Sequence, residues 1–221
     1  KISKISFVLP TYNRIGWISE CIQSLILQTE KDIEIIIVDD CSTDKTYILT
    51  DYYAKLDTRV KVIRNKTNQG AGLSRNIGNK AATADIIAVC DSDDFYSKDR
   101  AELILREFKK QKVQLLQTSY YRVDYSGQIE NNGNYLAHDF VTKDFLAGKP
   151  IYFCHPSAAY RRQDALKVPY KKETNKETDD HMFVTDWIKS GRTIRKINDF
   201  TTFHRVLPGS IMSCMRGGSL E

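Results

Sequence analysis

The first half of the chain alternates between short continuous apolar runs and longer segments whose apolar residues recur every three or four positions. Continuous apolar runs are typical of strands buried on both faces, and the wider spacing is typical of helices with one buried side. The runs predict strands at residues 5–9, 33–38, 60–64 and 86–90. The spaced segments predict helices at residues 16–28, 44–56 (capped by Ser42 or Thr43), 70–84 after a short loop, and 98–111.

This order of strands and helices predicts a parallel, doubly wound α/β sheet with helices on both faces. Ligands of such sheets bind beyond the carboxyl ends of the strands. Polar residues follow all four predicted strands, so we expect one polar site at that edge of the sheet. These residues are Pro10, Thr11, Tyr12 and Asn13 after the first strand, Asp39 and Asp40 after the second, Asn65 after the third, and Asp91, Ser92, Asp93 and Asp94 after the fourth.

The second half of the chain is less regular. We expect one domain over residues 1–221, divided into halves at residues 1–112 and 113–221. The patterns predict a strand at 115–125, a turn at Ser126 and Gly127, a hairpin or loop at 128–141, and a short helix near 143–147. Further along, they predict a strand after His155, Pro156 and Ser157, a helix at 180–190 ended by Gly191, and a strand at 193–197.

Composition narrows the class of protein. The 221 residues are 41% hydrophobic and 28% charged, which suits a well-packed globular domain. The five cysteines are odd in number and contain no CxxC pair, so we expect a reducing, cytoplasmic location rather than a disulfide framework or a zinc–thiolate site. No apolar run approaches the roughly 20 residues that span a bilayer, and the start at Lys1 resembles no signal peptide. The net charge of +5 suits a polyanionic ligand or an anionic membrane surface.

Asp91 and Asp93 are separated by one residue and follow a predicted buried strand. Two such carboxylates can bind Mg²⁺ or Mn²⁺, which bridges the phosphates of a diphosphate leaving group. The same pattern also describes a solvated turn with a helix-capping aspartate. A calcium loop fits poorly, because Phe95 and Tyr96 stand where that loop needs an oxygen ligand and a glycine. The absence of GxGxxG and GxxxxGK[ST] motifs disfavours dinucleotide oxidoreductases and P-loop NTPases.

Four ordered motifs resemble those of family 2 glycosyltransferases with the GT-A fold, of the bacterial surface-polysaccharide type. The resemblance is strong over residues 5–110 and looser over 150–213. It implies a nucleotide-sugar half at 1–112 with a UDP-linked donor, and an acceptor and catalytic-base half at 113–221. The motifs are Pro10 to Asn13, Val38 to Asp44, Asn68 to Gly70 with Ser74 to Asn76, and Asp91 to Asp94.

The resemblance also implies roles for single residues in the donor site. Thr11 and Tyr12 would lie against the base, Asp39 would accept from the uracil ring, and Arg75 would lie near the nucleotide. Asp91 would hold the ribose directly or through the metal, and Asp93 would ligate Mn²⁺ or Mg²⁺. Tyr12 could instead cover the sheet edge, and Arg75 could pair with a nearby carboxylate. The full predicted donor site is Pro10, Thr11, Tyr12, Asn13, Asp39, Gly70, Arg75, Asp91, Ser92 and Asp93.

The catalytic base in this family is a carboxylate at a helix start, often in a Glu-Asp pair. Asp180 fits this place, with Asp179 standing where the family usually has Glu. As base, Asp180 would take the proton of the acceptor hydroxyl during an in-line attack that inverts the anomeric carbon. An aspartate here could also simply cap the helix.

Other residues of the second half have looser predicted roles. His155 resembles a family position near the acceptor, and His204 could approach the diphosphate or the metal. The expected acceptor is a carbohydrate or a lipid-linked carbohydrate, and no nucleic acid is expected. Five basic residues could face anionic lipid at the inner face of the membrane or form an ordinary solvated surface: Arg161, Arg162, Lys167, Lys171 and Lys172.

Two alternative functions remain open. A sugar-nucleotide nucleotidyltransferase would use a similar sheet and metal, but usually has a glycine- and lysine-rich loop where this chain has Pro10 to Asn13. A non-catalytic nucleotide-binding module would share the fold, although Asp91, Asp93 and Asp180 argue against it.

Overall fold

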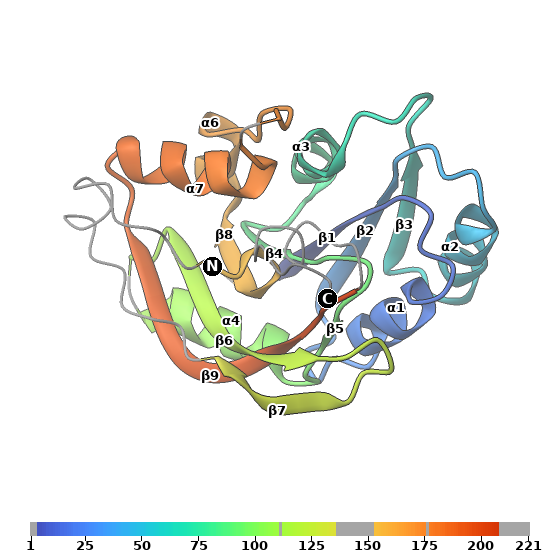
Figure 1. Cartoon of the computed structure of the whole chain (residues 1–221). Helices are drawn as coiled ribbons and strands as arrows, with labels where there is room; N and C mark the ends of the chain where they lie inside the picture. Colours follow the sequence, from blue (N-terminus) through green and yellow to red (C-terminus); the bar gives the residue numbers. More distant parts are fainter. Residues whose placement is uncertain (1–3, 111, 136–152, 176, 208–221) are drawn as a thin grey trace, which may run out of the picture.

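The computed structural model describes residues 4–110, 112–135, 153–175 and 177–207. A nine-stranded sheet runs through this part of the chain (Figure 1). Its first four strands are parallel and lie in the order β3-β2-β1-β4, as the alternating sequence pattern predicts. They are β1 (Ile5–Thr11), β2 (Ile33–Asp39), β3 (Val60–Arg64) and β4 (Ile86–Val89).

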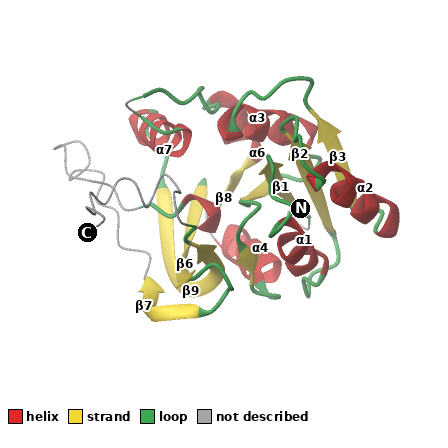
Figure 2. Ribbon diagram, turned by 45° about the vertical axis from the view of Figure 1, so that its right-hand side comes forward, coloured by secondary structure: helices red, strands yellow, loops and turns green. Residues whose placement is uncertain are grey.

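Helices cover both faces of this parallel part (Figure 2). Phe7 and Leu9 of β1 point into one core with α1 and α4, whereas Val8 points into a second core with α7. Successive residues of a strand face opposite ways, so a strand buried on both faces must be apolar throughout. The helices are α1 (Ile18–Ile26), α2 (Thr46–Leu56), α3 (Ala71–Ala81), α4 (Arg100–Lys110), α6 (Arg162–Lys167) and α7 (Asp179–Lys189).

The second half continues the same sheet with antiparallel pairs. β8 pairs antiparallel with β4 and β6, β9 runs parallel to β6, and β5 and β7 lie at the edge. The predicted α/β, Rossmann-like sheet flanked by helices is therefore confirmed, and its division at residues 112 and 113 stays a prediction. These elements are β5 (Phe95–Tyr96), β6 (Leu115–Val123), β7 (Ile129–Tyr135), the 3-10 helix η1 (His155–Ser157), β8 (Ala158–Arg161) and β9 (Ile194–Arg205).

Some local predictions are wrong. β1 continues through Pro10 to Thr11, and β9 ends at Arg205, far beyond the predicted residue 197. Neither Ser42 nor Thr43 caps α2; instead an oxygen of Asp44 accepts the backbone N–H of Thr46 at 2.8 Å.

β5 and α6 escaped prediction because each is too short to show a period. The predicted helix near 143–147 and the 136–141 part of the predicted hairpin lie outside the described residues. No helix in the described ranges has the length and apolar character needed to cross a membrane.

Arg100 joins the two halves of the sheet from within. Its side chain is fully buried at the start of α4 and donates to the carbonyl oxygens of Val89 at 2.8 Å and Pro156 at 2.8 Å. Its guanidinium also lies 4.3 Å from the centre of the Tyr96 ring. These contacts hold η1 against the end of β4, directly beneath the aspartates that follow β4.

Candidate active site

Asp39 and Asp40 follow β2 and serve different purposes. Asp40 is buried and its carboxylate accepts the backbone N–H of Gly70 at 2.7 Å and the side-chain amide of Asn65 at 2.7 Å. It therefore fixes the loop before α3, a role that the sequence did not reveal. Asp39 is also buried, and its Oδ2 has no hydrogen-bond donor among the described residues, although Arg64 Nε lies 3.3 Å away.

The motif of residues 10–13, at the end of β1, mainly holds neighbouring loops in place. Asn13 adopts a positive φ of 50°, and its Oδ1 accepts the backbone N–H groups of Thr43 at 2.8 Å and Asp44 at 3.2 Å. Asn13 therefore holds the neighbouring loop in place. Thr11 is buried, whereas Tyr12 is 41% exposed and presents a free aromatic surface.

The loop before α3 owes its shape to Gly70. Its φ of 94° lies in a region that residues with a side chain rarely adopt. The N–H of Gly70 is directed at Asp40, so Asp40 and Gly70 together set the start of α3.

Pro10 and Ser92 of the predicted donor site are both buried in the structure.

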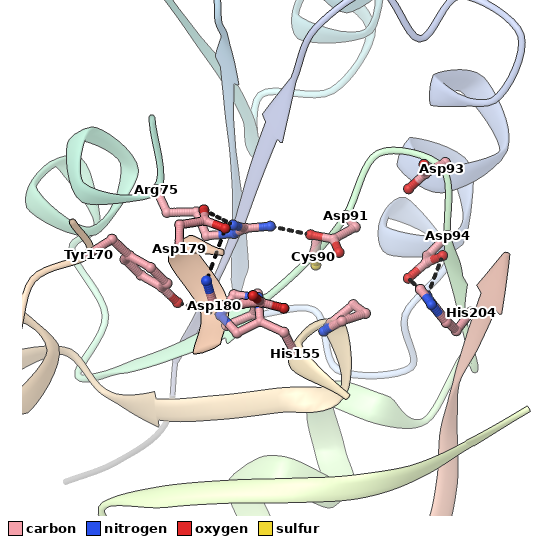
Figure 3. A network of polar contacts seen from close by, with 12 residues as sticks. Arg75, Cys90, Asp91, Asp93, Asp94, His155, Tyr170, Asp179, Asp180 and His204 are labelled. Atoms are coloured by element: carbon pink, nitrogen blue, oxygen red, sulfur yellow. Dashed lines mark hydrogen bonds and ion pairs between the residues drawn. The ribbon is translucent and has the colours of Figure 1, made fainter. Parts of the chain in front are cut away.

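Arg75 on α3 occupies the centre of the site (Figure 3). One guanidinium nitrogen lies 2.5 Å from Asp91 Oδ1, and another lies 3.0 Å from Asp179 Oδ2. The prediction that Arg75 could pair with a nearby carboxylate is thus met twice. Although burial opposes a charged guanidinium, Asp91 and Asp179 raise the pKa of Arg75, which stays protonated at all ordinary pH values. The bridge brings the end of β4 and the start of α7 together.

Asp180, the predicted base, lies in the first turn of α7. Its Oδ1 accepts hydrogen bonds from the hydroxyl of Thr178 and from the backbone N–H of His181, the latter at 2.7 Å. Burial alone would raise the pKa of Asp180, but these two hydrogen bonds and the charge of Arg75 lower it overall. The carboxylate is therefore ionised at neutral pH. Its other oxygen, Oδ2, has no hydrogen bond from any described residue.

Asp93 and Asp94 lie close to the end of β9. Asp94 is fully buried; its carboxylate contacts His204 Nδ1 at 3.1 Å and accepts the backbone N–H of Arg205 at 2.8 Å (Figure 3). Arg205 Nε donates to the carbonyl oxygen of Asp93 at 2.9 Å. Burial opposes protonation of His204, but Asp94 prevails and raises the pKa of His204 to about 9. Sequence reasoning noticed Asp94 and His204 separately and did not pair them.

The acidic loop, residues 91–94, suits a cation that is also coordinated by a bound ligand. Burial and the neighbouring Asp94 raise the pKa of Asp93, so a positive ion beside Asp93 would relieve an unfavourable charge. Among the described residues no three His, Cys, Asp or Glu side chains are arranged to hold a metal. A Mg²⁺ or Mn²⁺ ion usually binds to one or two carboxylates together with substrate phosphates and water, and Asp93 and Asp91 fit that mode.

His155 is part of a buried network beside α7. Its Nε2 lies 2.7 Å from the hydroxyl of Tyr170, and its Nδ1 has no partner among the described residues. Burial and the charge of Arg75 lower the pKa of His155 to about 3, so the ring is neutral. Tyr170 stacks on Phe183 with ring centres 4.1 Å apart. This network supports the start of α7 from below.

The five basic residues of the second half do not form a free patch. Arg161 donates to the carbonyl oxygen of Val113 at 2.7 Å, Arg162 donates to that of Asn79 at 3.0 Å, and Lys171 pairs with Asp186 at 2.7 Å. Lys167 and Lys172 are exposed. Three of the five therefore have structural partners, and membrane contact stays a prediction.

The sheet and the aspartates beyond β4 define a GT-A glycosyltransferase fold, and solved structures share it. S. aureus TarS residues 1–349 in complex with UDP-GlcNAc superposes with a TM-score of 0.77 at 23% identity, covering 98% of this chain and 62% of that 1–349 chain. The mannosyltransferase PcManGT from Pyrobaculum calidifontis in complex with GDP-Man and Mn²⁺ gives a TM-score of 0.67 at 16% identity, covering 98% of this chain and 65% of that one.

The profile described as Glycosyl transferase family 2 matches residues 6–168, and the chain belongs to this family. Glycosyltransferase GlyG of Streptococcus pneumoniae is 32% identical over 91% of this chain. An uncharacterised glycosyltransferase of Rickettsia conorii is 40% identical over 57% of it. The chain spans 64% of the length of the first relative and 20% of the second. The family predicted from the motifs is therefore confirmed.

Proposed function

We propose that this chain transfers a sugar from a nucleotide diphosphate to a hydroxyl group of a carbohydrate or lipid-linked acceptor, with inversion, in bacterial surface-polysaccharide synthesis. One observation carries the proposal: Arg75 bridges Asp91, in the predicted donor site, and Asp179, the neighbour of the predicted base. Residues that the chain separates widely thus meet at the carboxyl ends of the strands, where ligands of such sheets bind.

UDP is the proposed nucleotide. We expect Asp39 to accept the ring N–H of uracil once Arg64, whose Nε lies 3.3 Å from Asp39 Oδ2, moves aside, while the exposed Tyr12 ring can stack on the base. TarS was solved with UDP-GlcNAc and the mannosyltransferase with GDP-Man, so both nucleotides occur among proteins of similar fold. Asp93, with Asp91, would hold Mn²⁺ or Mg²⁺, which neutralises the charge that develops on the leaving diphosphate.

Asp180 is the proposed base. Its Oδ1 is occupied by Thr178 and His181, which leaves Oδ2 to receive the proton of the acceptor hydroxyl. The acceptor oxygen forms a bond to the anomeric carbon while the bond from that carbon to the phosphate oxygen breaks. The bonding electron pair leaves with UDP, and the proton stays on Asp180. Because its pKa is lowered, Asp180 is ionised at neutral pH and its Oδ2 carries no proton before the acceptor arrives.

The test is UDP release from a panel of UDP-sugars, with GDP-Man as a second nucleotide class, in the presence and absence of Mn²⁺. We expect release with at least one donor, and we expect Asp180→Asn to lower it by about 10²- to 10⁴-fold, the usual contribution of a general base. UDP affinity should stay within about threefold. Asp199→Asn, which changes an exposed aspartate of β9, serves as the matched control.

Three outcomes would contradict the proposal in different ways. Near-wild-type turnover by Asp180→Asn would remove Asp180 as the base. Mn²⁺-dependent UDP binding without release from any donor would favour a non-catalytic module. Pyrophosphate formation from UTP and a sugar phosphate would favour a nucleotidyltransferase.

The proposed acceptor also sets the expected location. Lipid-linked carbohydrate is assembled at a membrane, so the enzyme would work in the cytoplasm or at the inner face of the membrane. Lys167 and Lys172 are exposed members of the basic set that could approach anionic lipid there.

A further inference from the structure

Asp179, the first residue of α7, is held by three neighbours. Its Oδ2 lies 3.0 Å from a guanidinium nitrogen of Arg75, and its Oδ1 accepts the backbone N–H of Asp180 at 2.9 Å. A Cβ atom added to Gly72 would lie 2.7 Å from Asp179 Oδ2 and 2.8 Å from Asp179 Cβ. Helices α3 and α7 therefore approach so closely at this point that any side chain at position 72 would displace Asp179.

The other end of the bridge is equally constrained. The side chain of Arg75 is only 6% exposed, and its second nitrogen lies 2.5 Å from Asp91. A buried guanidinium cannot turn toward water without leaving two carboxylates unpaired in a poorly solvated place. Its position is consequently fixed from both sides, and one cation connects the loop after β4 to the first turn of α7.

We propose that Asp179 is a positioning residue: through Arg75 and against Gly72, it holds Asp180 at the working distance from the donor bound beside Asp91. This inference rests on the proposed function of the site. Asp179 does not touch the reacting atoms in this scheme. It sets where the first turn of α7 lies, and a displacement of about 1 Å at a base can lower a rate by up to about 100-fold.

Asp179→Asn separates this role from simple stabilisation of the helix start. Asparagine keeps a side-chain oxygen at the same place, so the contact with the backbone N–H of Asp180 can persist. The negative charge that Arg75 pairs with is lost. Gly72→Ala acts from the opposite side, because it leaves every charge in place and displaces the Asp179 side chain. Gly16→Ala is the matched control, since a Cβ there would meet nothing within 4 Å.

The experiment measures kcat and KM for UDP release, UDP affinity with Mn²⁺, and hydrogen exchange of the backbone amides of residues 180–183. We expect Asp179→Asn and Gly72→Ala to lower kcat by about 10- to 100-fold and to change UDP affinity by less than about threefold. Both variants should speed amide exchange at the start of α7. Asp179→Glu, which keeps the charge, should retain more activity than Asp179→Asn. Gly16→Ala should behave as the wild type.

Wild-type kcat in both variants would overturn the inference while leaving the proposed function intact. A loss of UDP affinity that matches the loss of kcat would also overturn it, because Asp179 would then act on the donor site. If the wild type releases no UDP from any donor, the proposed function fails. The amide-exchange measurement then tests by itself whether Asp179 holds the start of α7. Unchanged exchange in both variants would then show that Asp179 does not hold α7.

Discussion

Two charge clusters attach the second half of the chain to the loop after β4, and they use different cations. The Arg75 cluster (Arg75, Asp91 and Asp179) fastens α7, and the His204 cluster (Asp93, Asp94, His204 and Arg205) fastens β9. Arginine stays charged at all ordinary pH values, whereas the pKa of His204 is about 9. The attachment of α7 should therefore resist changes of pH that loosen the attachment of β9.

The largest expected effect comes from removing the cation of the Arg75 cluster. Arg75→Met leaves Asp91 and Asp179 close together without their shared partner, which should lower the free energy of unfolding by about 3–5 kcal/mol. Chemical denaturation measures this change. The control is Arg106→Met, because Arg106 is 52% exposed and its partner Glu107 keeps Lys110 and Arg195 as further partners, so its loss should cost less than about 1 kcal/mol. Equal costs for both variants would mean that the bridge contributes no more than a surface pair.

A pH series should distinguish the two clusters. The pKa of His204 rises from 6.5 to about 9 on folding, so the folded protein binds more protons between these values. This stabilisation is complete below about pH 6.5 and is lost as the pH rises through 9, by about 3 kcal/mol in total. His204→Gln should remove this loss, whereas Arg75→Met should keep it. The same pH dependence in His204→Gln and the wild type would show that another group is responsible.

The smallest expected effect on the free energy of unfolding concerns Arg14, which lies at the exposed rim of the His204 cluster beside Asp93. Arg14 Nε lies 3.5 Å from Asp93 Oδ2, and the side chain of Arg14 is 38% exposed. Water screens such a pair, so Arg14→Met should change the free energy of unfolding by less than about 1 kcal/mol. A loss above about 2 kcal/mol in the same denaturation assay would mean that Arg14 belongs to the cluster rather than to its rim.

The sequence predicted the side of the site that the parallel strands build. Asp39, Asp91 and Asp93 follow buried apolar runs, and the carboxyl ends of parallel strands necessarily meet at one edge. Their position therefore follows from local patterns alone. The start of α7 was also predictable, because Asp179 and Asp180 precede a helical pattern.

The pairings between distant residues were not predictable in this way. Asp94 lies 110 positions from His204, and Arg75 lies 104 positions from Asp179. No local period encodes such contacts, since they depend on how far β9 extends and how closely α3 approaches α7. The close approach of Gly72 to Asp179 likewise required the fold.

The length of β9 has a consequence for how the protein is made. Asp94 leaves the ribosome 110 residues before its partner His204, which at 5–20 residues per second corresponds to roughly 5–20 s. During that interval the parallel strands can already pair, while a carboxylate destined for full burial has no imidazolium to face. Synthesis of β9, rather than formation of the first strands, is then the step at which the loop of residues 91–94 acquires its final shape.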